Sequence, residues 1–79
     1  MRLEPQTRAD LIETLRKELP TVFARAEVPN LLGGMIAAGT LANLDSAKSG
    51  PAGTFRMGRK VIYRRDPFLV WLGDRLSRV

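Results

Sequence analysis

Residues 54–72 read TFRMGRKVIYRRDPFLVWL, and this stretch decides the fold. Two short β-prone runs flank a turn built around Gly58, with Arg59 and Lys60 at its tip. The pattern predicts a β-hairpin over Thr54–Arg64, because apolar residues alternate along both runs and a glycine-containing turn joins them. The apolar hairpin positions are filled by Phe55, Met57, Val61 and Tyr63.

A helix is expected directly after the hairpin. Asp66 is a favourable N-cap, and Pro67 suits the first helical position. The apolar residues that follow recur at i, i+3, i+4 and i+8, as Phe68, Trp71, Leu72 and Leu76. Because large aromatic side chains dominate the burial available to a small domain, we expect Phe68 and Trp71 to lie in the core.

Two shorter segments precede the hairpin. Residues 25–32 can form a brief helix that buries Val28, Leu31 and Leu32. Pro29 either kinks this helix or marks a later start near itself, because proline removes a backbone hydrogen bond. Gly33 and Gly34 then supply a turn without steric limits on φ.

The next helix is predicted over Met35–Ser46. Its apolar residues are Ile36, Leu41 and Leu44. A second face carries Thr40, Asn43 and Ser46, where solvated helices usually carry Lys and Glu. Two short helices around a glycine turn, the second with a small polar face, match the helix-turn-helix arrangement.

The N-terminal part of the chain predicts an additional helix over about residues 8–19. Its apolar residues recur at helical spacing, as Leu11, Ile12, Leu15 and Leu19. Thr7 and Asp10 resemble a capping box, and Pro20 ends the helix. We interpret the apolar stripe as core rather than as a partner surface, and we expect a short β-prone run at Thr21–Phe23.

Composition limits the function classes. The 79 residues allow one small domain over residues 1–79, with no second folded unit. The chain has no Cys and no His, which excludes zinc fingers and triad-type hydrolases, and no catalytic residue, cofactor or metal ligand is predicted. No secretory segment or apolar run long enough for a bilayer is visible, so we expect a cytoplasmic protein without a membrane partner.

Charge is distributed unevenly. Residues 1–47 carry five cations and six anions, whereas residues 48–79 carry eight cations and two anions, within a total net charge of +5. Arg59 and Lys60, flanked by Arg56 and Arg64, make the hairpin a compact positive prong. A localised basic patch is typical of proteins that neutralise phosphates, although a solvated face with no partner would look the same.

The sequence from Val22 to Leu72 resembles the excisionase-like and AlpA-like prophage regulators, small winged helix-turn-helix proteins of the MerR-like superfamily. The residues that carry the resemblance are FARAEVPNLLGG, GTLANLDS, the GP of the loop, and FRMGRKVIYRRDPFLVWL. The chain departs from the family pattern at Pro29, at Ala37 and Ala38, and in its long loop over 47–53. The resemblance implies a mainly α fold with a small β-hairpin as the wing.

The resemblance also implies a set of DNA-binding residues. The recognition-helix positions facing the major groove are Thr40, Asn43 and Ser46, and the wing positions are Arg56, Arg59 and Lys60. Lys48 and Arg64 complete the predicted DNA contacts. Asparagine can pair bidentately with an adenine edge, and arginine favours narrow minor grooves. Two alternatives stay open: Asn43 can brace its own backbone, and Thr40 can contact a phosphate rather than a base.

The leading hypothesis is therefore a sequence-specific double-stranded DNA-binding protein of phage or mobile-element type. It would act as a transcriptional regulator or as a recombination directionality factor, with a homodimer or a recombinase as further partners. The alternative is a protein-interaction adaptor that keeps the scaffold without reading DNA. An RNA-binding module is disfavoured because Phe55 and Tyr63 have places in the hairpin core, which leaves no stacking surface.

Overall fold

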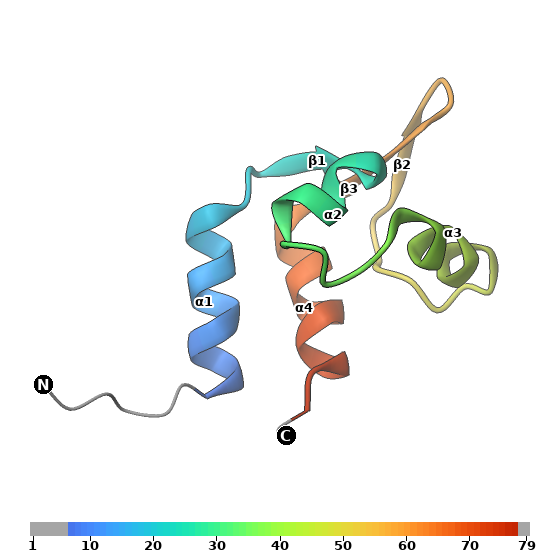
Figure 1. Cartoon of the computed structure of the whole chain (residues 1–79). Helices are drawn as coiled ribbons and strands as arrows, with labels where there is room; N and C mark the ends of the chain where they lie inside the picture. Colours follow the sequence, from blue (N-terminus) through green and yellow to red (C-terminus); the bar gives the residue numbers. More distant parts are fainter. Residues whose placement is uncertain (1–6, 78–79) are drawn as a thin grey trace, which may run out of the picture.

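The computed structural model describes residues 7–77, which form helices packed on a small antiparallel sheet (Figure 1). The elements in chain order are α1 (Arg8–Glu18), β1 (Val22–Ala24), the 3-10 turn η1 (Arg25–Glu27), α2 (Val28–Leu31), α3 (Ala38–Ser46), β2 (Phe55–Met57), β3 (Lys60–Arg64) and α4 (Arg65–Arg75). This arrangement confirms the expected combination of helices with a small β-hairpin. None of the described helices is long and apolar enough to cross a membrane.

The N-terminal helix forms as predicted. Thr7 Oγ1 accepts a hydrogen bond from the Asp10 amide, and the Asp10 carboxylate accepts one from the Thr7 amide, both at 3.1 Å. This capping box begins α1, and the chain leaves the helix just before Pro20. Figure 1 shows α1 beside α4. Ile12 and Leu15 pack half-buried against the core, so the apolar stripe is structural, as predicted.

The segment around Pro29 resolves the alternatives that the sequence leaves open. Arg25–Glu27 forms a 3-10 turn, and α2 begins at Val28 with Pro29 in its first turn. Proline is tolerated there because the first amides of a helix have no intrahelical partner. Gly33 and Gly34 adopt φ of +61° and +81°, which makes the predicted turn into α3.

The helix predicted from Met35 begins only at Ala38. Ala37, the N-cap residue, is extended, with φ −81° and ψ 149°, and offers no side-chain cap. Met35 and Ile36 therefore belong to the turn, and α3 keeps its predicted end at Ser46. Leu41 anchors α3 in the core with no exposed surface.

The hairpin forms, but its register places the apolar residues differently from the prediction. Phe55 lies opposite Ile62, and Met57 lies opposite Lys60, across a two-residue turn of Gly58 and Arg59. Since opposed residues share a face, Phe55 and Met57 point away from the buried side chains of the facing strand. Both are exposed, by 61% and 68%, so the prediction that Phe55 has a place in the hairpin core is wrong, and with it the expectation that no aromatic stacking surface remains for RNA.

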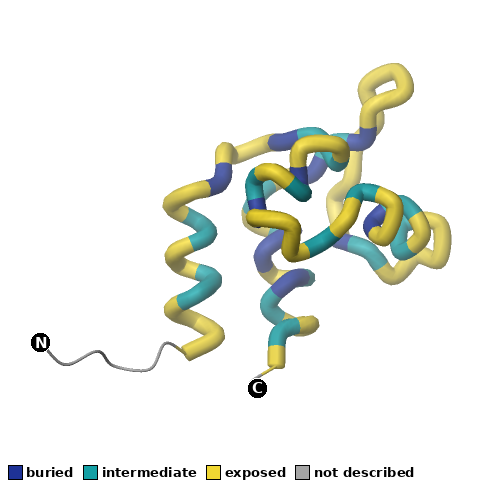
Figure 2. Tube along the Cα trace, viewed as in Figure 1, coloured by how far each residue is buried: buried dark blue, intermediate teal, exposed yellow. Residues whose placement is uncertain are grey.

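β1 completes a three-stranded sheet in the order β1-β3-β2. Phe23 pairs with Tyr63 in the centre of the β1–β3 ladder. These two rings pack against Phe68 of α4, with centroids between 5.1 and 6.2 Å apart. Figure 2 shows burial concentrated in this region, whereas the far end of the hairpin is exposed. Phe68 is fully buried as predicted, but Trp71 is only half-buried.

The start of α4 also differs from the prediction. The helix begins at Arg65 after Arg64 as N-cap, and no side-chain cap is made, so Asp66 is not the N-cap. The Asp66 carboxylate instead accepts hydrogen bonds from Arg65 at 3.1 Å and from Arg16 of α1 at 2.6 Å. These contacts, above all the one from Arg65, lower the pKa of Asp66. An acid in the first turn is favoured by the helix dipole without capping it.

Candidate nucleic-acid interface

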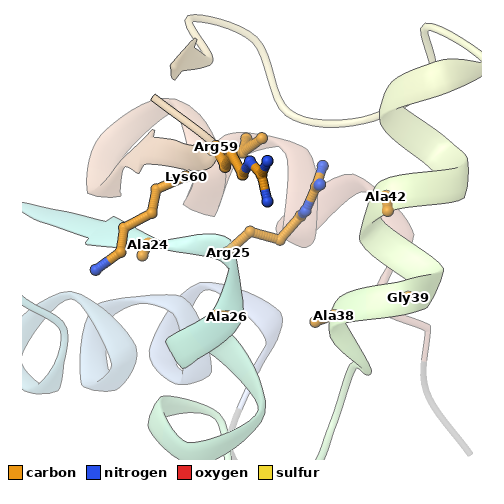
Figure 3. Close-up of a pocket in the computed structure, with 9 residues that line it drawn as sticks. Ala24, Arg25, Ala26, Ala38, Gly39, Ala42, Arg59 and Lys60 are labelled. Atoms are coloured by element: carbon orange, nitrogen blue, oxygen red, sulfur yellow. The ribbon is translucent and has the colours of Figure 1, made fainter. Parts of the chain in front are cut away.

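An open groove of about 370 Å³ separates α3 from the hairpin (Figure 3). Its lining consists of small residues and three cations: Ala24, Arg25, Ala26, Ala38, Gly39, Ala42, Arg59, Lys60 and Val61. Short side chains let a bulky ligand approach the backbone closely, and none of these lining residues is acidic. The lining cations therefore favour an anionic ligand over a cation.

Two of the three cations point into the groove. In Figure 3 the guanidinium groups of Arg25 and Arg59 lie between the hairpin and α3, whereas the Lys60 ammonium points past Ala24. Arg59 is in the hairpin turn, and Arg25 begins η1 immediately after β1. The fold thus brings together cations that are more than thirty residues apart in the sequence.

Arg25 is also part of a hydrogen-bonded cluster that we call the Asp45 cluster, made of Arg25, Asp45 and Tyr63. Asp45 Oδ2 accepts hydrogen bonds from Arg25 Nη1 at 3.0 Å and from the Tyr63 hydroxyl at 2.5 Å. The Arg25 and Asp45 side chains are only 25% and 19% exposed, and Tyr63 is fully buried. The cluster ties α3 to η1 and to the central strand of the sheet.

The surroundings keep the Tyr63 hydroxyl protonated. Burial, reinforced by the hydrogen bond to the Asp45 carboxylate, raises the pKa of Tyr63 well above its ordinary value. Gly50 approaches the same carboxylate so closely that an added Cβ would clash with Asp45 Oδ1. A side chain at position 50 would therefore require the Asp45 carboxylate to shift.

The predicted recognition residues lie on the outer surface of α3. Thr40, Asn43 and Ser46 are all exposed. At about 100° per residue, Asn43 and Ser46 lie on the side of the helix that continues from groove-lining Ala42, and Thr40 lies farthest from it. None of the three lines the groove, but Asn43 and Ser46 lie on the adjoining side of the helix and Thr40 on the opposite margin of the exposed face.

Lys48 follows the end of α3. The Lys48 amide bonds to the Asp45 carbonyl at 3.1 Å, and the Ser49 amide bonds to the Leu44 carbonyl at 2.8 Å. This pair of bonds is a Schellman motif, in which the residue at C′ adopts a left-handed conformation and is usually glycine. Lys48 takes this position with φ 60°, exposed to solvent and away from the groove lining.

The predicted wing cations do not all gather at one place. Arg56, Arg59, Lys60 and Arg64 are all exposed. Arg64 lies four residues from Lys60 along β3, a separation of about 13 Å along an extended strand. Arg56 lies opposite Val61 and lines a smaller hollow with Arg25 and Asp45. The groove itself receives Arg59 and Lys60 alone from the predicted set.

Sequence reasoning missed Arg25 and the Asp45 cluster. The signal present in the sequence was weak: Ala38, Gly39 and Ala42 are small residues on one side of a helix, and Arg25 directly follows a β-prone run.

Comparison of the chain with protein families, with curated proteins and with solved structures finds no match.

Proposed function

We propose that this protein binds double-stranded DNA as a winged helix-turn-helix, with α3 as the recognition helix and the β2–β3 hairpin as the wing. The observation that carries the proposal is the groove between them, which has a floor of small residues and is lined by Arg25, Arg59 and Lys60. Such a groove can accommodate one sugar-phosphate backbone of a duplex while the flanking elements lie in neighbouring DNA grooves.

The division of charge supports this assignment. The hairpin supplies cations, which bind any duplex by releasing counterions from phosphates. The outer face of α3 supplies Asn43 and Ser46, whose neutral side chains can hydrogen-bond to base edges. Affinity is thus assigned to the hairpin and the choice of sequence to α3. The sequence resemblance adds a biological role to the proposal, that of a transcriptional regulator or a recombination directionality factor of the excisionase-like kind.

Binding of a labelled duplex, followed by fluorescence anisotropy at several salt concentrations, tests the proposal. We expect the affinity to fall as salt rises, and the R59A/K60A variant to bind every duplex more weakly, with a salt slope reduced by about 2. The matched control removes two cations of α1, Arg8 and Lys17, and should leave the slope unchanged.

Two results would contradict the proposal. One is an absence of duplex binding by the wild-type protein at low salt, which would favour a protein-interaction adaptor. The other is an equal loss of DNA affinity in the hairpin variant and in the α1 control, which would show that affinity depends on the net charge of the protein and not on the hairpin.

A further inference from the structure

The outward face of the sheet is apolar and cationic. Strand register places seven residues on this face, namely Val22, Ala24, Phe55, Met57, Lys60, Ile62 and Arg64. An antiparallel sheet with one face in the core normally presents polar side chains on the other. Here the only charged residues of the face are two cations, and the remaining five are apolar.

Three of these apolar side chains are well exposed. Val22 is 52% exposed, Phe55 61% and Met57 68%. Phe55 and Met57 lie on the edge strand β2, so their side chains contribute little burial to the core. Their apolar character is therefore not explained by the stability of the fold, and it points to a surface that is covered when a partner binds.

The charge of the hairpin and the position of the apolar face indicate which kind of partner covers this face. All four charged residues of 54–64 are cations, which favours an anionic partner. Ala24 and Lys60 belong both to this face and to the lining of the groove between α3 and the hairpin. The apolar face thus continues the surface on which the proposed function seats DNA.

We propose that the hairpin acts as an apolar wedge, with Met57 and Phe55 entering the DNA minor groove and partly unstacking a base step. This inference rests on the proposed function and adds a mechanism to it. Met57 immediately precedes the Gly58–Arg59 turn, so its side chain lies near the leading end of the hairpin. Apolar wedges of this kind kink a duplex toward the major groove, and Phe and Met are among the residues that form them.

The neighbouring cations fit the same mode of binding. Arg59 and Lys60 flank the wedge on the turn side, where they can contact the phosphates on either side of a minor groove. A flexible thioether adapts its shape to an irregular base step more readily than a branched side chain does. The protein would therefore bend the DNA that it binds, which brings distant sites on a duplex closer together.

Energy transfer between dyes at the two ends of an AT-rich duplex, measured with the wild-type protein and with the F55S/M57S variant, tests the wedge. We expect the wild-type protein to bend the duplex by roughly 20–90°, and the variant to bind it within about tenfold of the wild-type affinity while leaving it nearly straight. V70S, which changes an exposed apolar residue of α4, is the matched control and should bend the duplex as the wild-type protein does.

The outcomes separate the wedge from the proposed function. A variant that binds and bends as the wild-type protein does would overturn the wedge, and so would a wild-type protein that binds without bending. An absence of wild-type binding would overturn the proposed function itself. Because Phe55 and Met57 are exposed, the variant should fold, and the single M57S substitution offers the same test if the double variant does not.

Discussion

Helix α3 and the hairpin border the same groove but are built in opposite ways. Among the nine residues of α3 only Asp45 is charged; its carboxylate is paired with Arg25 and accepts a hydrogen bond from Tyr63. The hairpin carries four cations, and every residue of β2 is exposed. α3 is anchored at Leu41 and at the Asp45 cluster, whereas β2 is held along one edge by β3.

Under the proposed function, this difference fits two separate tasks. A helix that reads base edges must hold its side chains in a fixed position, because hydrogen-bond readout depends on geometry. A hairpin that follows phosphates needs charge more than fixed geometry, since the phosphate attraction is independent of sequence. Substitutions in the Asp45 cluster should therefore act on folding and on the placement of α3, and substitutions of the hairpin cations should act on affinity.

The largest effect is expected from D45A. Removing the carboxylate leaves the buried Tyr63 hydroxyl and the half-buried Arg25 guanidinium without their shared partner, which should lower the free energy of unfolding by about 2–3 kcal/mol. Urea denaturation followed by circular dichroism measures this loss. E13A, which removes an exposed ion pair with Arg16, is the control and should cost less than about 1 kcal/mol. Equal losses in the two variants would show that the Asp45 cluster does not hold α3.

A smaller effect, confined to binding, is expected from N43A. If the Asn43 side chain reads a base, its removal should cost about 1–3 kcal/mol on the preferred duplex and little on random DNA. Selection of a preferred site from random duplexes, followed by anisotropy on both DNAs, measures the difference. S49A, in the loop beyond α3, is a control that should leave the preference intact. An equal loss on both DNAs would make Asn43 a positioning residue.

The Asp45 cluster should also weaken at alkaline pH. The pKa of Tyr63 is raised in the folded state, so above the ordinary pKa of tyrosine the unfolded chain loses a proton that the folded protein keeps. This contribution to stability is complete below about pH 10 and falls by up to about 1.4 kcal/mol per pH unit above it. Urea denaturation of the wild-type protein and of Y63F at pH 9 to 11 isolates the effect. An identical pH dependence in both proteins would exclude Tyr63 as its source.

The smallest effect is expected at the end of α3, where K48G should raise the free energy of unfolding by about 1 kcal/mol. The left-handed conformation of Lys48 is costly for a residue with a Cβ and not for glycine. If the Lys48 cation also contacts a phosphate, the same substitution should lower DNA affinity and the salt slope by about 1. Increased stability with unchanged DNA binding would remove Lys48 from the interface.

The sequence predicted elements whose signals are local. The capping box of α1, the glycine turn before α3 and the hairpin over residues 54–64 each depend on neighbouring residues, and each is present. One error concerns competition for a side chain that no single local pattern describes. Asp66 looks like an N-cap, but arginines of α1 and α4 hold its carboxylate inside the first turn of the helix.

The candidate site was predictable only in part, for a related reason. The hairpin cations and the polar face of α3 are visible in the sequence, because they follow from composition and from helical periodicity. The contacts of Arg25 with Asp45 and of Tyr63 with Asp45 span 20 and 18 residues, and no local pattern encodes them. The two-residue turn sets the pairing of β2 with β3, and this pairing decides on which face of the sheet Phe55 and Met57 lie. A shift of the pairing by one residue would move every side chain of the strand to the other face.

The most direct test of the account is a titration of the isotope-labelled protein with duplex DNA, followed by amide chemical shifts in NMR. We expect the amide chemical shifts to change on the outer face of α3, around the groove at Arg25 and along the hairpin from Arg56 to Lys60. The chemical shifts of the α1 amides should stay unchanged. Changes confined to α1 and α4, or none at all at low salt, would contradict the assignment of this groove to DNA.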